Sequence, residues 1–330
     1  MNNNSSSCSD EDIVDNNIEF EDNNEVKLYK TYYVDLLGGN IQSFLKKSRL
    51  TQFINNRGID INDKRFDNNI KNLSDKISFK DFIDLINSNI ILFKKIFEND
   101  LIISDWGQLK NTINNIYNNT KNINSGKKAD YIPQLAKANP NLYGVSVYTL
   151  DGREYHIGDH DYQFCIQSCS KPISYLLALE EHGLDYVSNH IGKEPSGCKF
   201  NSFRFNDENK PFNPLINAGA IMACSLIKPK ERDDLRYNHI MDTWKKIVGD
   251  KNVEFDNTVY LSEKLTAYRN NALANIMMEN GIFPEGTDIE KTLQLYFQAC
   301  SIKMNTCSLA KCAAMLCNGG VIDNKEVFSA

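Results

Sequence analysis

Residues 164–181 read FCIQSCSKPISYLLALEE and join a short apolar segment to a helix through a turn rich in serine. Pro172 is typical of the first turn of a helix. The apolar residues that follow it predict a helix over 173–181. Ser168 therefore stands where a helix opens, and Lys171 follows it three residues later.

The sequence before this stretch predicts a β-hairpin. Gly144–Leu150 alternates in a strand-like way, and Asp151-Gly152 is a dipeptide preferred in two-residue hairpin loops. Residues 153–158 are therefore expected to return as the second antiparallel strand. Further along, the small and apolar residues of 216–227 predict a core helix that is too short to span a membrane.

Length and charge divide the chain into a tail and a folded part. Its 330 residues suggest about two domains. Residues 1–25 hold eight acidic residues and no Lys or Arg, so the whole-chain net charge of −6 leaves +2 for residues 26–330. The tail has few large apolar side chains and is expected to be disordered. The nearly neutral remainder offers no electrostatic footprint for nucleic acid or an anionic membrane.

Residues 26–104 are expected to form a small helical module. Apolar residues recur there at helical spacing, as in Phe79, Phe82 and Ile83. The loop Gly58–Asp63 suggests a calcium loop between two helices, but it lacks the alternating oxygen ligands, central Gly and closing Glu of an EF-hand. The module is therefore expected to be EF-hand-like without calcium ligands.

Cysteine usage and targeting signals predict a reduced, cytoplasmic protein. The nine cysteines include no C-x-x-C pair and have no His at zinc-finger spacing, so neither a zinc site nor a disulfide scaffold is predicted. Most lie among small or apolar residues, where Cys behaves as a buried hydrophobe. No apolar run approaches the roughly 20 residues of a membrane span. The acidic N-terminus resembles neither a secretory signal nor a transit peptide.

The candidate nucleophile is Ser168, with Lys171 as its base. Residues three apart share a helix face, and a lysine whose pKa is lowered by burial can accept the hydroxyl proton. The N-terminal amides of the helix can help to stabilise an oxyanion. The alternative is a serine that only caps a helix, because the Ser-x-x-Lys pattern occurs six times, at Ser43, Ser125, Ser168, Ser196, Ser225 and Ser308.

Other common chemistries lack their motifs. The chain has no G-x-S-x-G elbow, P-loop, G-x-G-x-x-G or H-E-x-x-H. The five histidines form no ligand cluster in the sequence. His156 and His160 flank the second hairpin strand and are expected to be solvated rather than ligands. No metal site is therefore predicted.

Several longer motifs, in order along the chain, carry a family resemblance: ADYIPQLAK (129–137), QSCSKP (167–172), GKEPSG (192–197), NPLINAGA (213–220), FPEGTD (283–288) and YFQACSI (296–302). From about residue 28 to its end, the chain resembles the serine-dependent glutaminases, most of all the animal kidney type. For residues 105–330 the resemblance implies an α+β domain of the serine β-lactamase/DD-peptidase type, with an antiparallel sheet and a helical cluster. It implies hydrolysis of L-glutamine to L-glutamate and ammonia, in glutamine catabolism and glutamate biosynthesis, without cofactor or metal.

The resemblance also assigns roles by position. Ser168 would form a γ-glutamyl ester, with Lys171 as its base. Tyr131 and Tyr296 would line the pocket, position the substrate and relay protons. The amino-acid end of glutamine is a zwitterion. Its α-ammonium needs a carboxylate from the protein, and its α-carboxylate needs amide N–H donors. The residues that would hold the amino-acid end of glutamine supply these groups: Asn217, Glu263 and Asn270.

Two departures from the family pattern bear on activity. Ala267-Tyr268 stand where the family usually has Gly-Asp, and a positive φ at that Gly would strain Ala267 and displace Asn270. The chain stops at Ala330, whereas family members continue through another active-site tyrosine, part of the oxyanion site and further strands. A catalytic domain incomplete at its C-terminus is therefore expected, with few partners for the hairpin 144–158 and feeble activity alone.

Two alternatives to an active glutaminase stay open. One is a weak or inactive relative that acts by associating with complete glutaminase subunits. The other is a different Ser-x-x-Lys acylase, which would not need the three residues assigned to the amino-acid end. The expected partners are L-glutamine and further copies of the chain, as a dimer or tetramer, with no nucleic acid and no membrane. By analogy with the family, a mitochondrial location competes with the cytoplasmic one.

Overall fold

The computed structural model describes residues 24–38, 44–57, 59, 61–62, 64–66, 69–101, 103, 105–249, 252–323 and 325–329. The chain divides into two compact units, Met1–Leu109 and Lys110–Ala330. The tail expected over 1–25 lies outside the described residues except for its last two, Asn24 and Glu25, which open a helix. These two residues correct the expected boundary of the tail.

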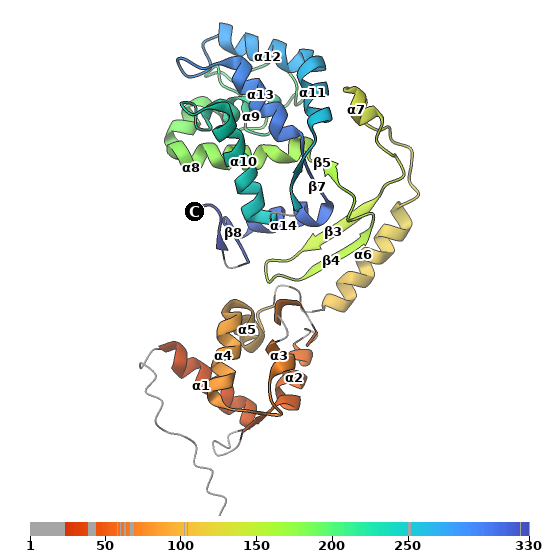
Figure 1. Cartoon of the computed structure of the whole chain (residues 1–330), viewed down its shortest axis with the longest axis vertical. Helices are drawn as coiled ribbons and strands as arrows, with labels where there is room; N and C mark the ends of the chain where they lie inside the picture. The colour runs from red at the N-terminus through yellow and green to blue at the C-terminus, as the bar shows by residue number, and fades with distance from the viewer. Residues whose placement is uncertain are drawn as a thin grey trace, which may run out of the picture. The chain divides into compact units, whose positions relative to one another are not determined.

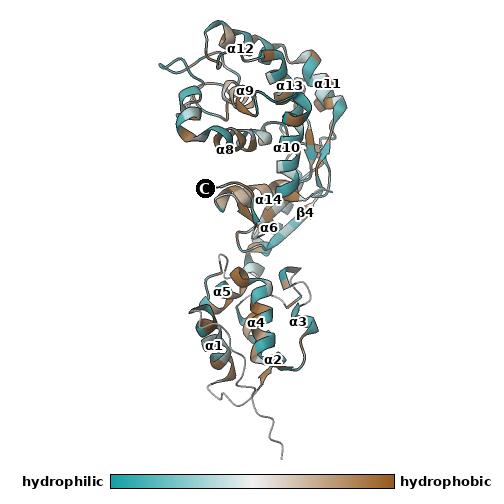
Figure 2. Cartoon of the chain, turned by 60° about the vertical axis from the view of Figure 1, so that its left-hand side comes forward, coloured by the Kyte–Doolittle hydropathy of each residue, from teal (hydrophilic) through white to brown (hydrophobic). Residues whose placement is uncertain are grey.

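The first unit is built of helices and one short β-ladder (Figure 1). Its elements are α1 (Asn24–Leu37), β1 (Leu45–Lys46), α2 (Lys47–Asn56), η1 (Lys64–Phe66), α3 (Asn69–Asn72), β2 (Lys76–Ile77), α4 (Phe79–Ser88) and α5 (Ile90–Glu98). Leu50, Phe82 and Phe93 lie in its core. Figure 2 shows the alternation of apolar and polar residues along its helices. The loop 58–63, expected to lack calcium ligands, lies partly outside the described residues.

The second unit is mixed α and β. Its helices are α6 (Trp106–Thr120, which begins before the unit boundary), α7 (Pro133–Ala136), η2 (Gln167–Ser170), α8 (Lys171–His190), α9 (Asn217–Leu226), α10 (Asp233–Val248), α11 (Asn257–Thr266), α12 (Tyr268–Glu279), α13 (Ile289–Cys300) and α14 (Thr306–Cys317). Its strands are β3 (Gly144–Tyr148), β4 (Glu154–Gly158), β5 (Phe164–Cys165), β6 (Glu254–Phe255), β7 (Ile302–Met304), β8 (Val321–Ile322) and β9 (Lys325–Glu326).

Helix α9 forms the centre of the helical cluster. All ten of its residues are buried, and α8, α12 and α13 pack against it (Figure 1). The helix predicted over 216–227 is thereby confirmed to within one residue at each end. Because a helix that is apolar all round needs neighbours on every side, this composition accounts for its central position.

Gly219 lets the preceding loop lie directly against α9. A Cβ atom at this position would stand 1.9 Å from Asn213 O and 2.9 Å from Pro214 Cα. Both neighbours are backbone atoms, which cannot rotate aside. The same loop carries Leu215, whose carbonyl faces the candidate site. The glycine therefore fixes the position of a segment that lines this site.

The variant Gly219→Ala is expected to melt at a lower temperature than the unchanged protein. Overpacking of this kind costs about 1–3 kcal/mol and occasionally more, and for a chain of this size each kcal/mol shifts the melting temperature by about 2–4 °C. Gly126→Ala is the matched control, since no atom lies within 4 Å of a Cβ built there. Equal melting temperatures for the two variants would contradict the close approach.

The predicted hairpin is confirmed, but its loop differs from the prediction. Strands β3 and β4 pair antiparallel over their full length, with Gly144 opposite Gly158. The pairing extends to a bond from Thr149 N to Arg153 O of 2.8 Å, which leaves three loop residues rather than two. Gly152 has a φ of +82°, the left-handed residue that closes a three-residue loop. The Asp-Gly signal thus located the turn but not its length.

A second small sheet holds the segment that precedes Ser168. Its strand order is β5-β7-β6, with Phe164 opposite Met304 and Phe255 opposite Ile302, both pairs antiparallel. Within the described residues β3 pairs with β4 alone, and α14 packs against β3. Among the described helices, none combines the length and the apolar character that crossing a membrane requires.

Candidate active site

Ser168 lies on a tight turn between β5 and α8. The turn is anchored by the bond from Ile166 N to Ile302 O of 2.9 Å, which continues the β5–β7 pairing. Gln167 has a φ of +47°, a left-handed conformation that is uncommon for a residue with a side chain. Ser168 follows within η2 and is exposed. The strand, the left-handed residue and the helix together hold its hydroxyl at the surface, where a substrate can reach it.

Lys171 begins α8 and is buried, with 3% of its surface exposed. Its Nζ donates to Leu215 O at 3.0 Å and to Asn217 Oδ1 at 2.9 Å. Burial lowers its pKa below the ordinary value, against a weak opposing effect of Cys300. In the described part of the chain no hydrogen bond joins Lys171 to Ser168. The sequence predicted the two at the start of one helix; Ser168 lies in η2 and Lys171 begins α8 directly after it, and no local pattern indicated the two acceptors.

Asn217 and Asn270 are brought together from different helices. Asn217, the first residue of α9, donates from Nδ2 to Asn270 Oδ1 at 2.8 Å. Asn270 lies in the first turn of α12, where its N–H donates to Ala267 O at 3.0 Å. Ala267 has φ −79° and ψ 50°. Any residue can adopt this φ, so Ala267 does not have the backbone strain that a positive φ would cause. Asn270 is not displaced and contacts Asn217.

Glu263 is a buried carboxylate on α11, with 3% of its surface exposed. Its pKa is raised by burial, and the nearby side-chain amide of Gln167 opposes this shift. Tyr131 OH donates to Gln167 Oε1 at 3.1 Å. The pKa of Tyr131 is raised, most of all by burial of its hydroxyl and next by the negative charge of Glu263. The residue as a whole is nevertheless largely exposed. Gln167 therefore lies between the tyrosine and the carboxylate.

Tyr296 lies on α13 and is buried like Lys171 and Glu263, with 5% of its surface exposed. Burial raises its pKa well above the ordinary range, with further contributions from Cys300, Cys224 and Glu263. The hydroxyl is therefore protonated at neutral pH and available as a donor. Cys300, one helical turn later, also influences Lys171 and Tyr131, so it belongs to the same buried region.

Burial separates the Ser168 copy of the Ser-x-x-Lys pattern from the others. Among the copies whose serine the structure describes, the lysine is buried only in the copy that starts at Ser168. The remaining lysines are exposed or half-exposed: Lys128, Lys199, Lys228 and Lys311. Only a buried amine has the lowered pKa that proton abstraction requires.

Three residues of this region were not predicted from the sequence. Gln167 precedes the serine in a left-handed conformation and contacts Tyr131. Cys300 lies near Tyr296 and Lys171. The ring of Phe200 lies 5.9 Å from Lys171 Nζ. Cys300 and Gln167 stand within the quoted motifs, but a motif alone does not show which of its side chains face one another.

Comparisons with known proteins agree on one family. The family model described as Glutaminase matches residues 126–330. A similar curated protein is the mitochondrial liver isoform of glutaminase from Rattus norvegicus, 38% identical over 251 residues, which are 76% of this chain and 42% of the relative. A glutaminase of Clostridium botulinum is 43% identical over 209 residues, 62% of this chain and 68% of the relative.

A solved structure described as the probable glutaminase ybaS is also similar. It is 34% identical with a TM-score of 0.63, and the match covers 68% of this chain and 73% of that one. The chain spans less than half the length of the rat relative.

Proposed function

The chain belongs to the glutaminase family, and we propose on this premise that it hydrolyses L-glutamine to L-glutamate and ammonia through a γ-glutamyl ester of Ser168. The predicted fold class, an α+β domain of the serine β-lactamase type, is confirmed by the mixed architecture and the solved glutaminase neighbours. The observation that carries the proposal is the buried amine of Lys171 at the start of α8, directly after the helix η2 that holds Ser168.

The hydrogen bonds of Lys171 suit a general base. A neutral amine has two N–H donors and one lone pair. The carbonyl of Leu215 and the amide oxygen of Asn217 accept both N–H groups. The lone pair is then left for the hydroxyl proton of Ser168. Burial favours this neutral form, since it disfavours the ammonium.

The proposed reaction proceeds in two steps. In the first, Ser168 Oγ attacks the side-chain amide carbon of glutamine while Lys171 Nζ takes its proton. Nζ then returns this proton to the leaving nitrogen, and ammonia departs from the γ-glutamyl ester. In the second step water attacks the ester carbon, again with Lys171 as base, and Ser168 regains its proton. In this proposal Tyr131 and Tyr296, both protonated at neutral pH, would donate to the substrate, and Tyr131 would exchange its bond to Gln167 for one to the substrate.

The amino-acid end of the substrate has complementary groups nearby. Glu263 is buried, and no salt bridge to it occurs among the described residues. A buried carboxylate without a cation is unfavourable, so the α-ammonium of glutamine would supply the missing charge. Asn270 uses its Oδ1 for Asn217, which leaves its Nδ2 group to donate to the α-carboxylate.

Glu263→Gln is expected to lower kcat/KM for glutamine on the order of 10²-fold, because the loss of one partner of a buried charge pair costs about 2–5 kcal/mol. The same change is expected to raise the melting temperature at neutral pH. The pKa of Glu263 is higher in the folded protein than in the unfolded chain, so the folded protein loses stability as pH rises between these two pKa values. Gln does not ionise and therefore avoids this loss. Exposed Glu285→Gln is the control. Unchanged kcat/KM would remove Glu263 from the binding site.

The function itself is tested by incubating the purified protein with glutamine, asparagine and a penicillin-type β-lactam. Equal amounts of ammonia and glutamate from glutamine alone are expected. Covalent labelling by the β-lactam that glutamine does not prevent would instead favour another Ser-x-x-Lys acylase.

We also propose a homo-oligomer and a cytoplasmic location. Sedimentation that shows only monomer at micromolar concentration would contradict the oligomer. The rat relative is named as mitochondrial, so imaging of the protein with a free N-terminus decides between that compartment and the cytoplasm. If the chain instead acts through complete glutaminase subunits, it would co-sediment with them and change their rate.

A further inference from the structure

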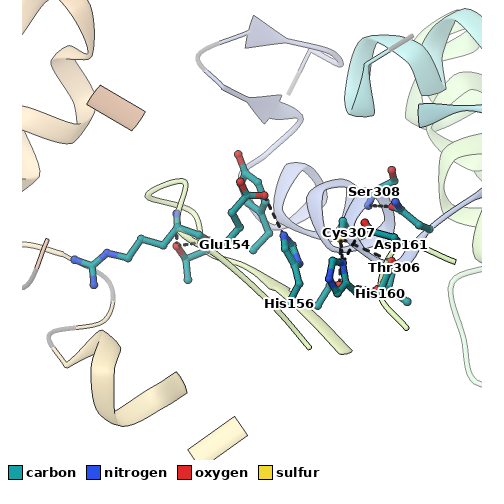
Figure 3. Close-up of polar contacts among 12 residues, drawn as sticks. Glu154, His156, His160, Asp161, Thr306, Cys307 and Ser308 are labelled. Carbon is teal, nitrogen blue, oxygen red and sulfur yellow. Dashed lines mark hydrogen bonds and ion pairs between the residues drawn. The ribbon is translucent and has the colours of Figure 1, made fainter. Parts of the chain in front are cut away.

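A cluster of three different metal-ligating groups lies between the end of β4 and the start of α14. His160 and Asp161 follow β4, and Cys307 is the second residue of α14 (Figure 3). One ligand atom from each lies within 4.8 Å of the other two. No local pattern in the sequence indicates this cluster, because Asp161 and Cys307 are 146 positions apart. His160 is also less exposed than predicted, with 30% of its side chain exposed.

Two of the three ligand separations match those of a tetrahedral metal centre, and the third is within 4.8 Å. His160 Nδ1 lies 3.4 Å from Cys307 Sγ and 3.2 Å from Asp161 Oδ1. With Zn–S of about 2.3 Å and Zn–N or Zn–O of about 2.0–2.1 Å, tetrahedral angles place ligand atoms about 3.3–3.6 Å apart. Both measured separations are close to this range. A small shift of side chains is therefore enough to enclose one ion.

The surroundings of Cys307 favour a bound cation. Ser146 Oγ donates to Cys307 Sγ at 3.6 Å, and the thiol lies in the first turn of α14, where the helix dipole favours a thiolate. Burial, and then the negative charges of Asp161 and Glu154, raise the pKa of the thiol. The same charges attract a cation. The Asp161 side chain is 82% exposed, which gives an ion a path from solvent.

Neighbouring contacts hold the ligands in place. Thr306 Oγ1 donates to His160 O at 3.2 Å and is 2.6 Å from Ser146 Oγ. The ring of His156 stacks on His160, with centroids 5.2 Å apart. These contacts restrict the His160 loop and the α14 terminus before any ion arrives. Such outer contacts orient ligands in metal sites.

We propose that His160 Nδ1, the Asp161 carboxylate and the Cys307 thiolate bind one zinc-class divalent cation, with water in the fourth position. Binding replaces the thiol proton, which passes to solvent. The ion joins residues far apart in the sequence and thereby fastens the loop after β4 to α14. Because three protein ligands leave one position open, small anions or thiols could reach the ion.

The test is a titration of the reduced, metal-stripped protein with Co²⁺ alone. One equivalent is expected to give the near-ultraviolet absorption of a cobalt–thiolate bond, and Zn²⁺ is expected to abolish it and to raise the melting temperature. Cys307→Ser should remove the absorption. Asp161→Asn should weaken Co²⁺ binding by more than about 100-fold, because the loss of an outer contact alone costs about 10–100-fold. Cys317→Ser, an exposed cysteine on the same helix, is the control.

Loss of the absorption in Cys307→Ser but not in Cys317→Ser, with both variants folded by circular dichroism, would support the site. The proposal is overturned if Co²⁺ gives no thiolate absorption, or if the absorption persists in Cys307→Ser. His160, Asp161 and Cys307 would then form only a hydrogen-bonded cluster. The readouts are spectroscopic and thermal, so they do not depend on glutamine hydrolysis.

Discussion

Ser168→Ala is expected to reduce glutamine hydrolysis by at least about 10³-fold, because loss of the nucleophile in a serine hydrolase costs up to about 10⁶-fold in kcat. The melting temperature should be unchanged. Ser168 is exposed, and no side-chain hydrogen bond is made by its Oγ in the described part of the chain. Ammonia release at saturating glutamine and a thermal melt measure the two effects.

The chain supplies its own control for this variant. Ser125 begins another Ser-x-x-Lys pattern, and its lysine, Lys128, is exposed. Ser125→Ala should leave both the rate and the melting temperature unchanged. Equal loss of activity in the two variants would mean that the loss does not depend on the nucleophile at Ser168.

Lys171→Met is expected to lower kcat by about 10²–10⁴-fold, the range attributed to general base catalysis. Lys171→Arg should be similarly inactive, because a guanidinium stays protonated and cannot accept the serine proton. Recovery of activity in Lys171→Arg would show that the site needs a positive charge rather than a base. Lys128→Met, on the exposed copy of the pattern, should retain full activity.

The pH dependence follows from the same amine. Activity should rise with pH through the folded pKa of Lys171, which burial places below the ordinary lysine value of 10.5. At a pH between that folded pKa and 10.5, Lys171 is protonated in the unfolded state but neutral in the folded state. The free energy of unfolding therefore also rises with pH in this window. Lys171→Met should remove this contribution to the slope. A rate that falls with pH over the window would contradict a neutral amine as base.

Local elements of the fold could be predicted from the sequence because their patterns are local. The strand alternation of 144–158 and the apolar residues of 216–227 each identified an element correctly. The length of the hairpin loop could not be read, since Thr149 pairs with Arg153 beyond the last regular strand residues. The β1–β2 ladder was missed because two-residue strands have no periodicity.

The candidate site was proposed from spacing and family resemblance, and its contacts could not be predicted from either. Spacing placed Lys171 one turn after Ser168, whereas its acceptor Asn217 lies 46 residues further along. Asn270 is another 53 residues away. Such contacts depend on how α8, α9 and α12 pack, and no local pattern specifies that packing. The left-handed Gln167 was equally hidden, because glutamine has no preference for that conformation.

The central claim is that Ser168 carries the γ-glutamyl group during turnover. The most direct measurement is mass spectrometry of the protein mixed with glutamine and quenched in acid within one turnover, followed by digestion. The account predicts that the peptide containing Ser168 gains the mass of one glutamyl group, and that this adduct is absent from Ser168→Ala and disappears when glutamine is exhausted. Release of ammonia and glutamate with no adduct on Ser168, or with the adduct on another residue such as Cys169, would contradict it.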